Sequence, residues 1–385
     1  MQTCALPSTK AQDGSRPTMG AERMDVLVGL LEGRRVGLVV NRTSVVGEQQ
    51  THLLDTLLAL GVDVRTVFAP EHGFRGSDEA GAAVADHRDA QTGLPVVSLY
   101  SGTNHSPDAA RLKDVDVIVF DIQDVGTRFY TYISTMHYLM EACALHDKRF
   151  VVADRPNPND YVDGPVRRAG FESFVGKHPI PVLHGLTVGE LAGMILGEGW
   201  LDAQGKRCDL TVVAMLGWNH GDAYRLPVPP SPNLPDAQAV GLYPSLCFFE
   251  GTSVSVARGT AFPFQALGYP DKKAGDYVFT PKPLPGFDSN PQHKDKRCYG
   301  VDLRGITFEG GLSLRFVLDF YRRLGSDEKA FFARPRWFDL LAGTDALRKQ
   351  IVAGMDEDEI RASWQAELND YKKIRRRYLL YNDSR

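Results

Sequence analysis

Short apolar runs rich in β-branched residues alternate with helical patterns through the first half of the chain, and this alternation limits its fold more than any other feature. Runs this short suit buried strands, and the stretches between them carry apolar residues at helical spacing. The rhythm predicts βαβ units and therefore a parallel sheet covered by helices on both faces. The expected strands are VGLVV (36–40), VRTVF (64–68), PVVSLY (95–100), VDVIVF (115–120), RFVVA (149–153) and DLTVVAM (209–215).

Helices are expected at 51–60, 130–146 and 188–197. Thr187 and Glu190 have the spacing of a capping box ahead of the third of these helices. The proline-rich segment 227–244 is interpreted as a structured connection rather than a helix, because proline favours extended or turn backbone. One last helix is expected from Ile360 to Tyr378, acidic at its start and basic at its end, which suits the helix dipole.

A chain of 385 residues is long enough for more than one hydrophobic core. We predict an α/β protein with a Rossmann-like parallel-sheet N-terminal domain followed by a smaller α+β C-terminal domain. Residues 1–22 are expected to form a disordered leader, residues 23–240 the Rossmann-like catalytic domain, and residues 241–385 an auxiliary domain that closes the cleft. The leader lacks the apolar segment of a complete signal peptide, and no run of about 18 apolar residues indicates a transmembrane segment.

Charge and cysteine usage argue against several function classes. The formal net charge of −4 disfavours nucleic acid as a partner, because binding it calls for a basic face. The sequence has no phosphate-binding loop and no GxGxxG motif after a strand, so no nucleotide cofactor is expected. The five cysteines are scattered and form no CxxC pair, so we expect neither a disulfide framework nor a structural zinc site. Four of them are interpreted as buried thiols: Cys143, Cys208, Cys247 and Cys298.

Polar loops follow three of the predicted strands. In open parallel sheets, ligands bind outside the carboxyl ends of the strands. The loops are APEHGFRG (69–76), DIQDVGTRFYTY (121–132) and DRPNPND (154–160). Two carboxyl groups in different environments are what glycoside cleavage usually requires, one to protonate the leaving oxygen and one ionised. The acidic residues expected to converge on this edge are Glu71, Asp121, Asp124 and Asp154.

Each of these features also has a structural interpretation. Glu71 could be a turn residue or an ion-pair partner of Arg75, and Asp121 could be a helix cap or anchor. His72 and His184 lie near strand ends, where metal ligands are common, but neither belongs to an HxH or HExxH pairing. We therefore predict no metal site and interpret His184 as a hydrogen-bonding residue at the start of a helix.

The loop 121–132 and its neighbour are dense in groups that suit sugar recognition. Hydroxyl groups of a sugar take hydrogen bonds, and its ring faces stack on aromatic side chains. Arg75, Arg128 and Arg155 could each hold a substrate carboxylate with two hydrogen bonds, or could instead tie down the neighbouring aspartates. The further candidates for substrate contacts are Gln123, Tyr130 and Asn157, together with His72, Asp154 and His184, which are named above.

In the second half, SPN (231–233) and FFEGTSVSVARGT (248–260) place polar residues among glycines and prolines. This pattern is expected where a loop closes over a polar ligand, although a strand-turn-strand with ordinary surface groups has a similar composition. The candidates for substrate binding are Ser231, Asn233, Glu250, Arg258 and Thr260.

Six strings, in this order, resemble the bacterial NamZ-type exo-β-N-acetylmuramidase family: APEHGFRG, FDIQDVGTRFYTYISTM, ADRPNP, HGLTVGELAGMI, PPSPNLP and FFEGTSVSVARGTAFPF. The resemblance runs from about Val36 to the C-terminal helix, and NRTS (41–44), Ser253 and Ala257 depart from the family's usual strings. It implies a cleft between two domains and no nucleotide or redox cofactor. It also implies hydrolysis of terminal β-1,4-linked N-acetylmuramic acid from muropeptides or peptidoglycan-derived glycans, in the cell envelope or periplasm.

By its place in the EHG motif, Glu71 is the general acid that the resemblance implies. Asp124, Asp121 and Tyr132 are the candidates for the second catalytic group. In this hypothesis Glu71 protonates the glycosidic oxygen while a carboxylate from the loop activates water or stabilises the oxocarbenium ion. The acetamido group of the sugar could act as the nucleophile instead.

Two rival functions are weighed against this one. The first is a metal-dependent hydrolase or deacetylase that uses the two histidines near the strand ends. The second is a non-catalytic muropeptide-binding protein built on the same cleft. Activity that survives metal removal speaks against the first, and product formation speaks against the second.

Overall fold

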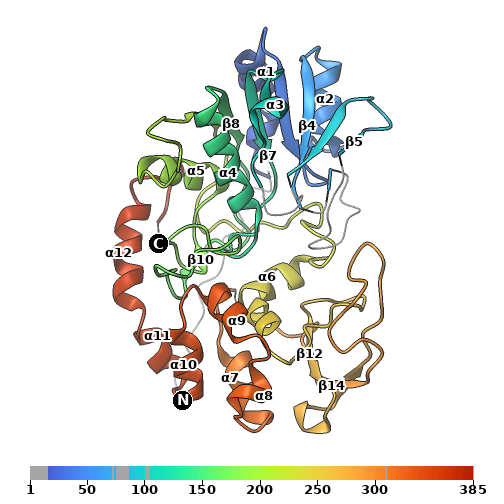
Figure 1. The fold of residues 1–385 in the computed structure, drawn as a ribbon, viewed down its shortest axis with the longest axis vertical. Coiled ribbons are helices and arrows are strands. Elements are labelled where there is room, and N and C mark those ends of the chain that lie inside the picture. The colour runs from blue at the N-terminus through green and yellow to red at the C-terminus, as the bar shows by residue number, and fades with distance from the viewer. Residues whose placement is uncertain (1–15, 72, 75–85, 100–104, 308–309, 385) are drawn as a thin grey trace.

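The computed structural model describes residues 16–71, 73–74, 86–99, 105–307 and 310–384. Its main feature is a seven-stranded sheet in the order β11-β8-β7-β1-β4-β6-β5 (Figure 1). Every neighbouring pair is parallel except the edge pair β5 and β6. The predicted parallel sheet is thus confirmed. The strands are β1 Val36–Val40, β4 Val64–Ala69, β5 His87–Arg88, β6 Pro95–Ser98, β7 Val117–Asp121, β8 Arg149–Ala153 and β11 Asp209–Val213.

Helices cover both faces of this sheet, because alternate strand residues point to opposite sides. Helices α1 and α2 pack on one face with residues such as Leu38 and Val67. Helices α3, α4 and α5 pack on the other face with residues such as Phe68 and Phe120. Two separate cores therefore hold the sheet in place. The helices are α1 Met24–Leu31, α2 Leu53–Ala59, α3 Ala109–Leu112, α4 Tyr132–Leu145 and α5 Val188–Gly197.

Helix α5 begins at the capping box that the sequence predicts. The Thr187 side chain accepts a hydrogen bond from the Glu190 backbone, and the Glu190 carboxylate accepts one from the Thr187 backbone. The helix expected at 51–60 starts two residues later, because β3 (Thr51–His52) first pairs with β2 (Val45–Val46). The His52 ring then caps the helix by accepting a hydrogen bond from Leu54 N.

The proline-rich segment contains a helix that we did not expect. Helix α6 runs over Ala237–Leu246, is capped by Asp236, and has Pro244 in its interior. A proline removes the backbone hydrogen bond to the carbonyl four residues earlier. Here the freed Val240 carbonyl accepts a hydrogen bond from Asn159 Nδ2 at 3.0 Å, which offsets that loss. Residue 240, the expected end of the first domain, lies inside α6. The domain boundary at this point stays a prediction.

The prediction that residues 1–22 form a disordered leader is wrong for residues 16–22. Residues 16–22 pack against the sheet edge: Thr18 exchanges two backbone hydrogen bonds with Leu216, and Met19 and Ala21 are buried. Gly20 lies so close to β8 and β11 that an added Cβ would be 2.4 Å from Asp154 N. The segment is held mainly through its backbone, so apolar periodicity could not reveal it.

The C-terminal part is smaller and of α+β type, as predicted (Figure 1). An antiparallel sheet of order β12-β14-β13 lies beside a group of short helices. No helix among the described residues is long and apolar enough to cross a bilayer. A further antiparallel pair, β9 with β10, precedes α5 in the chain. The elements are β9 Val162–Asp163, β10 Leu183–His184, β12 Ala266–Tyr269, β13 Tyr277–Phe279, β14 Cys298–Asp302, α7 Arg315–Arg323, α8 Glu328–Phe331, α9 Pro335–Ala342 and α10 Ala346–Val352.

The single helix expected at the C-terminal end is two helices, α11 (Glu357–Ala362) and α12 (Gln365–Arg375). Trp364 sits between them with a φ of −108°, and its side chain is buried in the core. The periodic apolar residues were identified correctly, since Ile360 and Leu368 are also buried. The non-helical backbone of Trp364 thus separates the two helices at a point where the indole is buried.

The segment after α12 returns to the N-terminal sheet and closes a buried polar network. His220 Nδ1 lies 3.0 Å from Asp160 and its Nε2 lies 2.9 Å from Glu190. Leu380 N donates to the same Glu190 carboxylate at 2.8 Å. The adjacent Tyr381 reaches the end of β8. Buried charges of this kind must be paired, and the tail supplies part of the pairing.

Candidate active site

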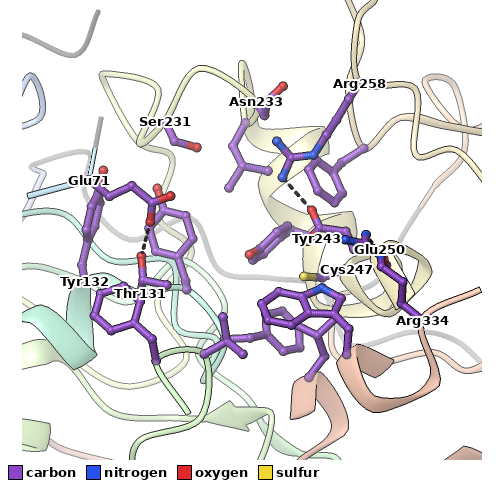
Figure 2. Close-up of a pocket in the computed structure, with 18 of the residues that line it drawn as sticks. Glu71, Thr131, Tyr132, Ser231, Asn233, Tyr243, Cys247, Glu250, Arg258 and Arg334 are labelled. Atoms are coloured by element: carbon purple, nitrogen blue, oxygen red, sulfur yellow. Dashed lines mark hydrogen bonds and ion pairs between the residues drawn. The ribbon is translucent and has the colours of Figure 1, made fainter. Parts of the chain in front are cut away.

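A cavity of about 770 Å³ lies between the end of β4 and the C-terminal part of the chain (Figure 2). Figure 2 shows Glu71 and Tyr132 on one wall and Glu250, Arg258 and Arg334 on the opposite wall. The volume falls in the range of pockets that bind small organic ligands, which is about 300–1,000 Å³. Aromatic side chains alternate with these polar groups, a mixture that suits a sugar.

Glu71 stands two residues beyond the carboxyl end of β4, where the backbone turns. Gly73 N donates to the Pro70 carbonyl at 3.0 Å, and Gly73 has a φ of +73°, which a glycine adopts without strain. Thr131 Oγ1 donates to Glu71 Oε2 at 2.7 Å. The carboxyl group is therefore held by a neighbouring loop while it faces the cavity (Figure 2).

Tyr132 and Tyr130 line the same wall as neutral phenols. Their ring centroids lie 4.9 Å apart in an edge-to-face arrangement. Burial, followed by the negative charge of Glu71, raises the pKa of Tyr132 above its usual value, and burial raises the pKa of Tyr130 well above its own. Tyr132 donates a hydrogen bond to the Pro230 carbonyl at 3.2 Å. Near neutral pH these side chains can donate hydrogen bonds but cannot serve as phenolate nucleophiles.

The opposite wall carries a net positive charge. Arg258 Nη2 lies 2.6 Å from Glu250 Oε1, and Arg334 Nη2 donates to the Glu250 carbonyl. Burial lowers the pKa of Arg258, but the Glu250 carboxylate outweighs that effect and raises it. Arg334 forms no ion pair with any residue in the part of the chain that the structure describes. With two guanidinium groups and one carboxylate, this wall is attractive to an anionic ligand.

Asp121 lies outside the cavity, in a buried ion pair. Arg155 donates from Nε to Asp121 Oδ1 at 2.5 Å and from Nη2 to Oδ2 at 2.9 Å. The Asp121 side chain is 0% exposed and that of Arg155 is 2% exposed. Arg155 also donates to the Val45 carbonyl. Both residues thus have the structural role that the sequence left open, and neither reaches the cavity.

Asp124 and Gln123 are buried in the backbone of their own loop. Asp124 Oδ2 accepts a hydrogen bond from Gly126 N at 2.6 Å, and burial raises the Asp124 pKa to about 7. Gln123 Nε2 donates to the carbonyls of Asp124 and Pro156. Neither side chain lines the cavity. The acidic loop therefore does not present a second carboxylate to Glu71.

Asp154 and Asn157 organise the loop after β8 and do not line the cavity either. Asp154 accepts hydrogen bonds from Thr187 Oγ1 at 2.7 Å and from Tyr381 at 2.6 Å. Burial raises the Asp154 pKa to about 6, and the hydrogen bond from Tyr381 partly opposes this rise. Asn157 Nδ2 donates to the Leu186 carbonyl at 3.0 Å. These contacts explain why the loop is polar without requiring a ligand.

The remaining sequence candidates divide in the same way. Arg128 is fully buried and donates to three backbone carbonyls, those of Pro165, Ile180 and Leu341. Burial lowers the pKa of His184 to about 3, so this ring is neutral near pH 7. The Thr260 hydroxyl donates a hydrogen bond to the Ala257 carbonyl. His72 and Arg75 lie outside the described residues. The candidates that the fold brings to the cavity are Glu71, Tyr130, Tyr132, Ser231, Asn233, Glu250 and Arg258.

Sequence reasoning missed several residues of the cavity wall. Thr131 lies inside a loop that was singled out, and its spacing from Glu71 gave no sign of the hydrogen bond. Arg334 and Trp337 lie at the start of α9, far from every motif that we considered. In the described part of the chain, no three His, Cys, Asp or Glu side chains come together in a way that could hold a metal ion.

Comparisons with known proteins agree with the motifs. The family models of exo-β-N-acetylmuramidase NamZ match residues 36–238 with the N-terminal part and residues 241–381 with the C-terminal part. The peptidoglycan β-N-acetylmuramidase NamZ of Bacillus subtilis (strain 168) is 37% identical over 408 residues, which cover 98% of this chain and 95% of that protein.

Two crystal structures of DUF1343 family proteins from Bacteroides fragilis NCTC 9343 have the same fold. The first has a TM-score of 0.88 and 43% identity, and covers 96% of this chain and 100% of that chain. The second has a TM-score of 0.81 and 31% identity, and covers 95% of this chain and 99% of that chain. With both family models matched along nearly the whole sequence, the chain belongs to the exo-β-N-acetylmuramidase NamZ family.

Proposed function

We propose that this protein is a glycosidase that releases terminal β-1,4-linked N-acetylmuramic acid from peptidoglycan fragments, with Glu71 as the general acid. The observation that carries the proposal is the position of Glu71, which is held by Thr131 in the wall of a sugar-sized cavity at the carboxyl edge of a parallel sheet. The Bacillus subtilis relative is named for the same activity on peptidoglycan. This substrate implies work at the cell envelope.

The second catalytic function is assigned to the substrate's own acetamido group. Among the described residues, Glu71 and Glu250 are the carboxylates that line the cavity, and Glu250 is paired with Arg258. Glu71 protonates the glycosidic oxygen as the bond from that oxygen to C1 breaks, and the acetamido oxygen forms a new bond to C1. Water then attacks C1, gives a proton to the Glu71 carboxylate and regenerates the acetamide, with net retention of configuration.

The positively charged wall supports recognition of a carboxylate on the substrate. Each N-acetylmuramic acid residue carries one lactyl carboxylate, which distinguishes it from N-acetylglucosamine. Arg258 and Arg334 are the described arginines that line the cavity. Charge-assisted hydrogen bonds from such groups are roughly twice as strong as neutral ones, so they favour glycans with muramic acid.

The assignment of Glu71 is tested with a chromogenic N-acetylmuramic acid glycoside. The variant Glu71→Gln keeps the size of the side chain and removes the proton donor, so we expect turnover to fall by a factor of about 100 or more. Glu32→Gln, at an exposed position, is the matched control and should behave like the wild type. Near-normal turnover of Glu71→Gln would reject the assignment.

Participation of the acetamido group is tested with substrates that carry zero to three fluorine atoms on the acetyl methyl group. Fluorine withdraws electrons from the attacking oxygen, so kcat should fall with each fluorine added. A kcat that is independent of fluorination would contradict the assignment and would indicate that another group of the protein attacks C1.

A further inference from the structure

A second cavity of about 480 Å³ adjoins the first and shares three residues with it, Glu250, Arg258 and Arg334. These three side chains form a ridge between the two spaces. On the far side of the ridge the second cavity is lined by Phe287, Asp288, Asn290 and Gln292, among others. None of the sequence motifs included these residues, and the proposed cleavage at Glu71 does not use them.

A tight turn holds Phe287 out of the protein core. Leu284 and Asp288 exchange two backbone hydrogen bonds of 2.9 Å, and Gly286 between them has a φ of +81°, which favours glycine. The Phe287 side chain is 46% exposed. Nearly half of the surface of this side chain stays in water, so the ring contributes less to folding than a buried phenylalanine does.

The turn is tied to the wall of the first cavity. Asn233 Nδ2 donates to the Phe287 carbonyl at 3.0 Å, and Asn233 itself lines the cavity that contains Glu71. The position of the exposed ring is thereby fixed relative to the proposed cleavage site. A mobile surface loop would not have this connection.

The composition of the second cavity is that of a carbohydrate subsite. One exposed ring offers a face for stacking, and nearby carboxylate and amide groups offer partners for sugar hydroxyls. A cavity of about 770 Å³ holds a ligand of roughly disaccharide size, so a longer glycan must extend beyond it. The ridge that the glycan would then cross includes Arg334, which has no ion-pair partner among the described residues.

We propose that the second cavity is a distal subsite that binds the third sugar of a longer glycan, with its ring on Phe287 and its lactyl carboxylate on Arg334. In an alternating chain with muramic acid at the cleaved end, the third sugar is again N-acetylmuramic acid. This inference rests on the proposed function, since it assumes cleavage at Glu71. It predicts a preference for glycans over disaccharides.

Chain-length dependence tests the role of Phe287. For the wild type we expect kcat/KM on a peptide-free tetrasaccharide to exceed that on the disaccharide by about 3- to 10-fold. Phe287→Ala should abolish this advantage without changing disaccharide kinetics or the melting temperature, and Phe287→Trp should retain it. Val278→Ala, at another exposed apolar position of the C-terminal part, is the control. Equal rates on both substrates in the wild type would overturn the inference.

A pair of trisaccharides tests the role of Arg334. They differ only in whether the third sugar is N-acetylmuramic acid or N-acetylglucosamine. The wild type should prefer the former by about 3- to 10-fold, and Arg334→Met should bring the ratio close to one. The ratio is insensitive to any general loss of activity in the variant. A ratio that Arg334→Met leaves unchanged would overturn the assignment of the carboxylate.

Failure of the proposed function and failure of the distal subsite would give different results. If the wild type does not cleave a chromogenic N-acetylmuramic acid glycoside or the disaccharide, the proposed function is wrong. If it cleaves both, and neither chain length nor the third sugar affects the rate, only the distal subsite is wrong.

Discussion

The buried ion pair between Asp121 and Arg155 allows a sharp test of structural against catalytic roles. Both side chains are almost completely removed from water and are joined by two hydrogen bonds. Removal of one partner leaves the other charge buried and unpaired, which typically costs about 3–5 kcal/mol. We therefore expect Arg155→Met to lower the free energy of unfolding by about that amount, or the melting temperature by roughly 10 °C.

A double-mutant cycle separates the pair from its surroundings. Asp121→Leu combined with Arg155→Met replaces both charges by apolar groups, so the double variant should be more stable than either single variant, with a coupling energy of about 3 kcal/mol. Asp116→Asn is the control, because Asp116 and Arg35 form an ion pair in which both side chains are more than one-third exposed. Its cost should stay below about 1 kcal/mol.

The assay combines thermal unfolding with turnover of a chromogenic substrate at a temperature well below the melting point of every variant. Asp121→Asn should be destabilised while its turnover stays within about tenfold of the wild type, because Asp121 does not line the cavity. Unchanged melting together with a loss of turnover of 100-fold or more would refute this reasoning and would make Asp121 a catalytic residue.

Three further predictions follow from burial and backbone geometry. Burial lowers the pKa of His220, but hydrogen bonds to its two carboxylates outweigh that effect and raise it to about 9. A raised pKa stabilises the fold below about pH 6.5, so this group should contribute up to about 3 kcal/mol that the wild type loses as the pH rises from 6.5 through 9. The urea midpoint of His220→Gln should fall less than that of the wild type over this window, and an equal fall in both would contradict the role of His220. At Gly126 the φ is +76° and an added Cβ would lie 1.9 Å from Asn157 Oδ1, so Gly126→Ala should lower the free energy of unfolding by about 2 kcal/mol or more. The control is Gly170→Ala, because Gly170 has a φ of +86° and no close neighbour, so this variant reports the backbone strain alone. Equal effects of the two variants in thermal melts would contradict the clash. Burial raises the pKa of all four described thiols, those of Cys143, Cys208, Cys247 and Cys298. At most one thiol per chain should therefore react quickly with Ellman's reagent before unfolding, and rapid reaction of two or more would contradict this burial.

Much of the fold could be predicted because its signals are local. β1 and β8 have the predicted bounds, since short apolar runs flanked by polar loops have few alternatives as buried strands. The capping box places the start of α5 in the same way. The helix at Pro244 could not be predicted locally, because the hydrogen bond that offsets the proline comes from Asn159, far away in sequence.

The candidate site was only partly predictable, for the same physical reason. The sequence placed Glu71 correctly at a strand end, because that position depends on β4 alone. Whether Asp121 is free or paired depends on Arg155, which belongs to a different loop. Arg334 reaches the cavity only because α9 packs close to it, and no motif in the chain encodes that packing.

The closure of the sheet edge by the C-terminal segment has a consequence for how the protein matures during synthesis. Leu380 and Tyr381 donate hydrogen bonds to Glu190 and Asp154, which precede them in the chain by 190 and 227 residues. Until the tail arrives, each carboxylate lacks one of its buried donors, although Thr187 already donates to both. The N-terminal layer can therefore complete its polar network only after residues 380 and 381 have been synthesised and have folded back onto it.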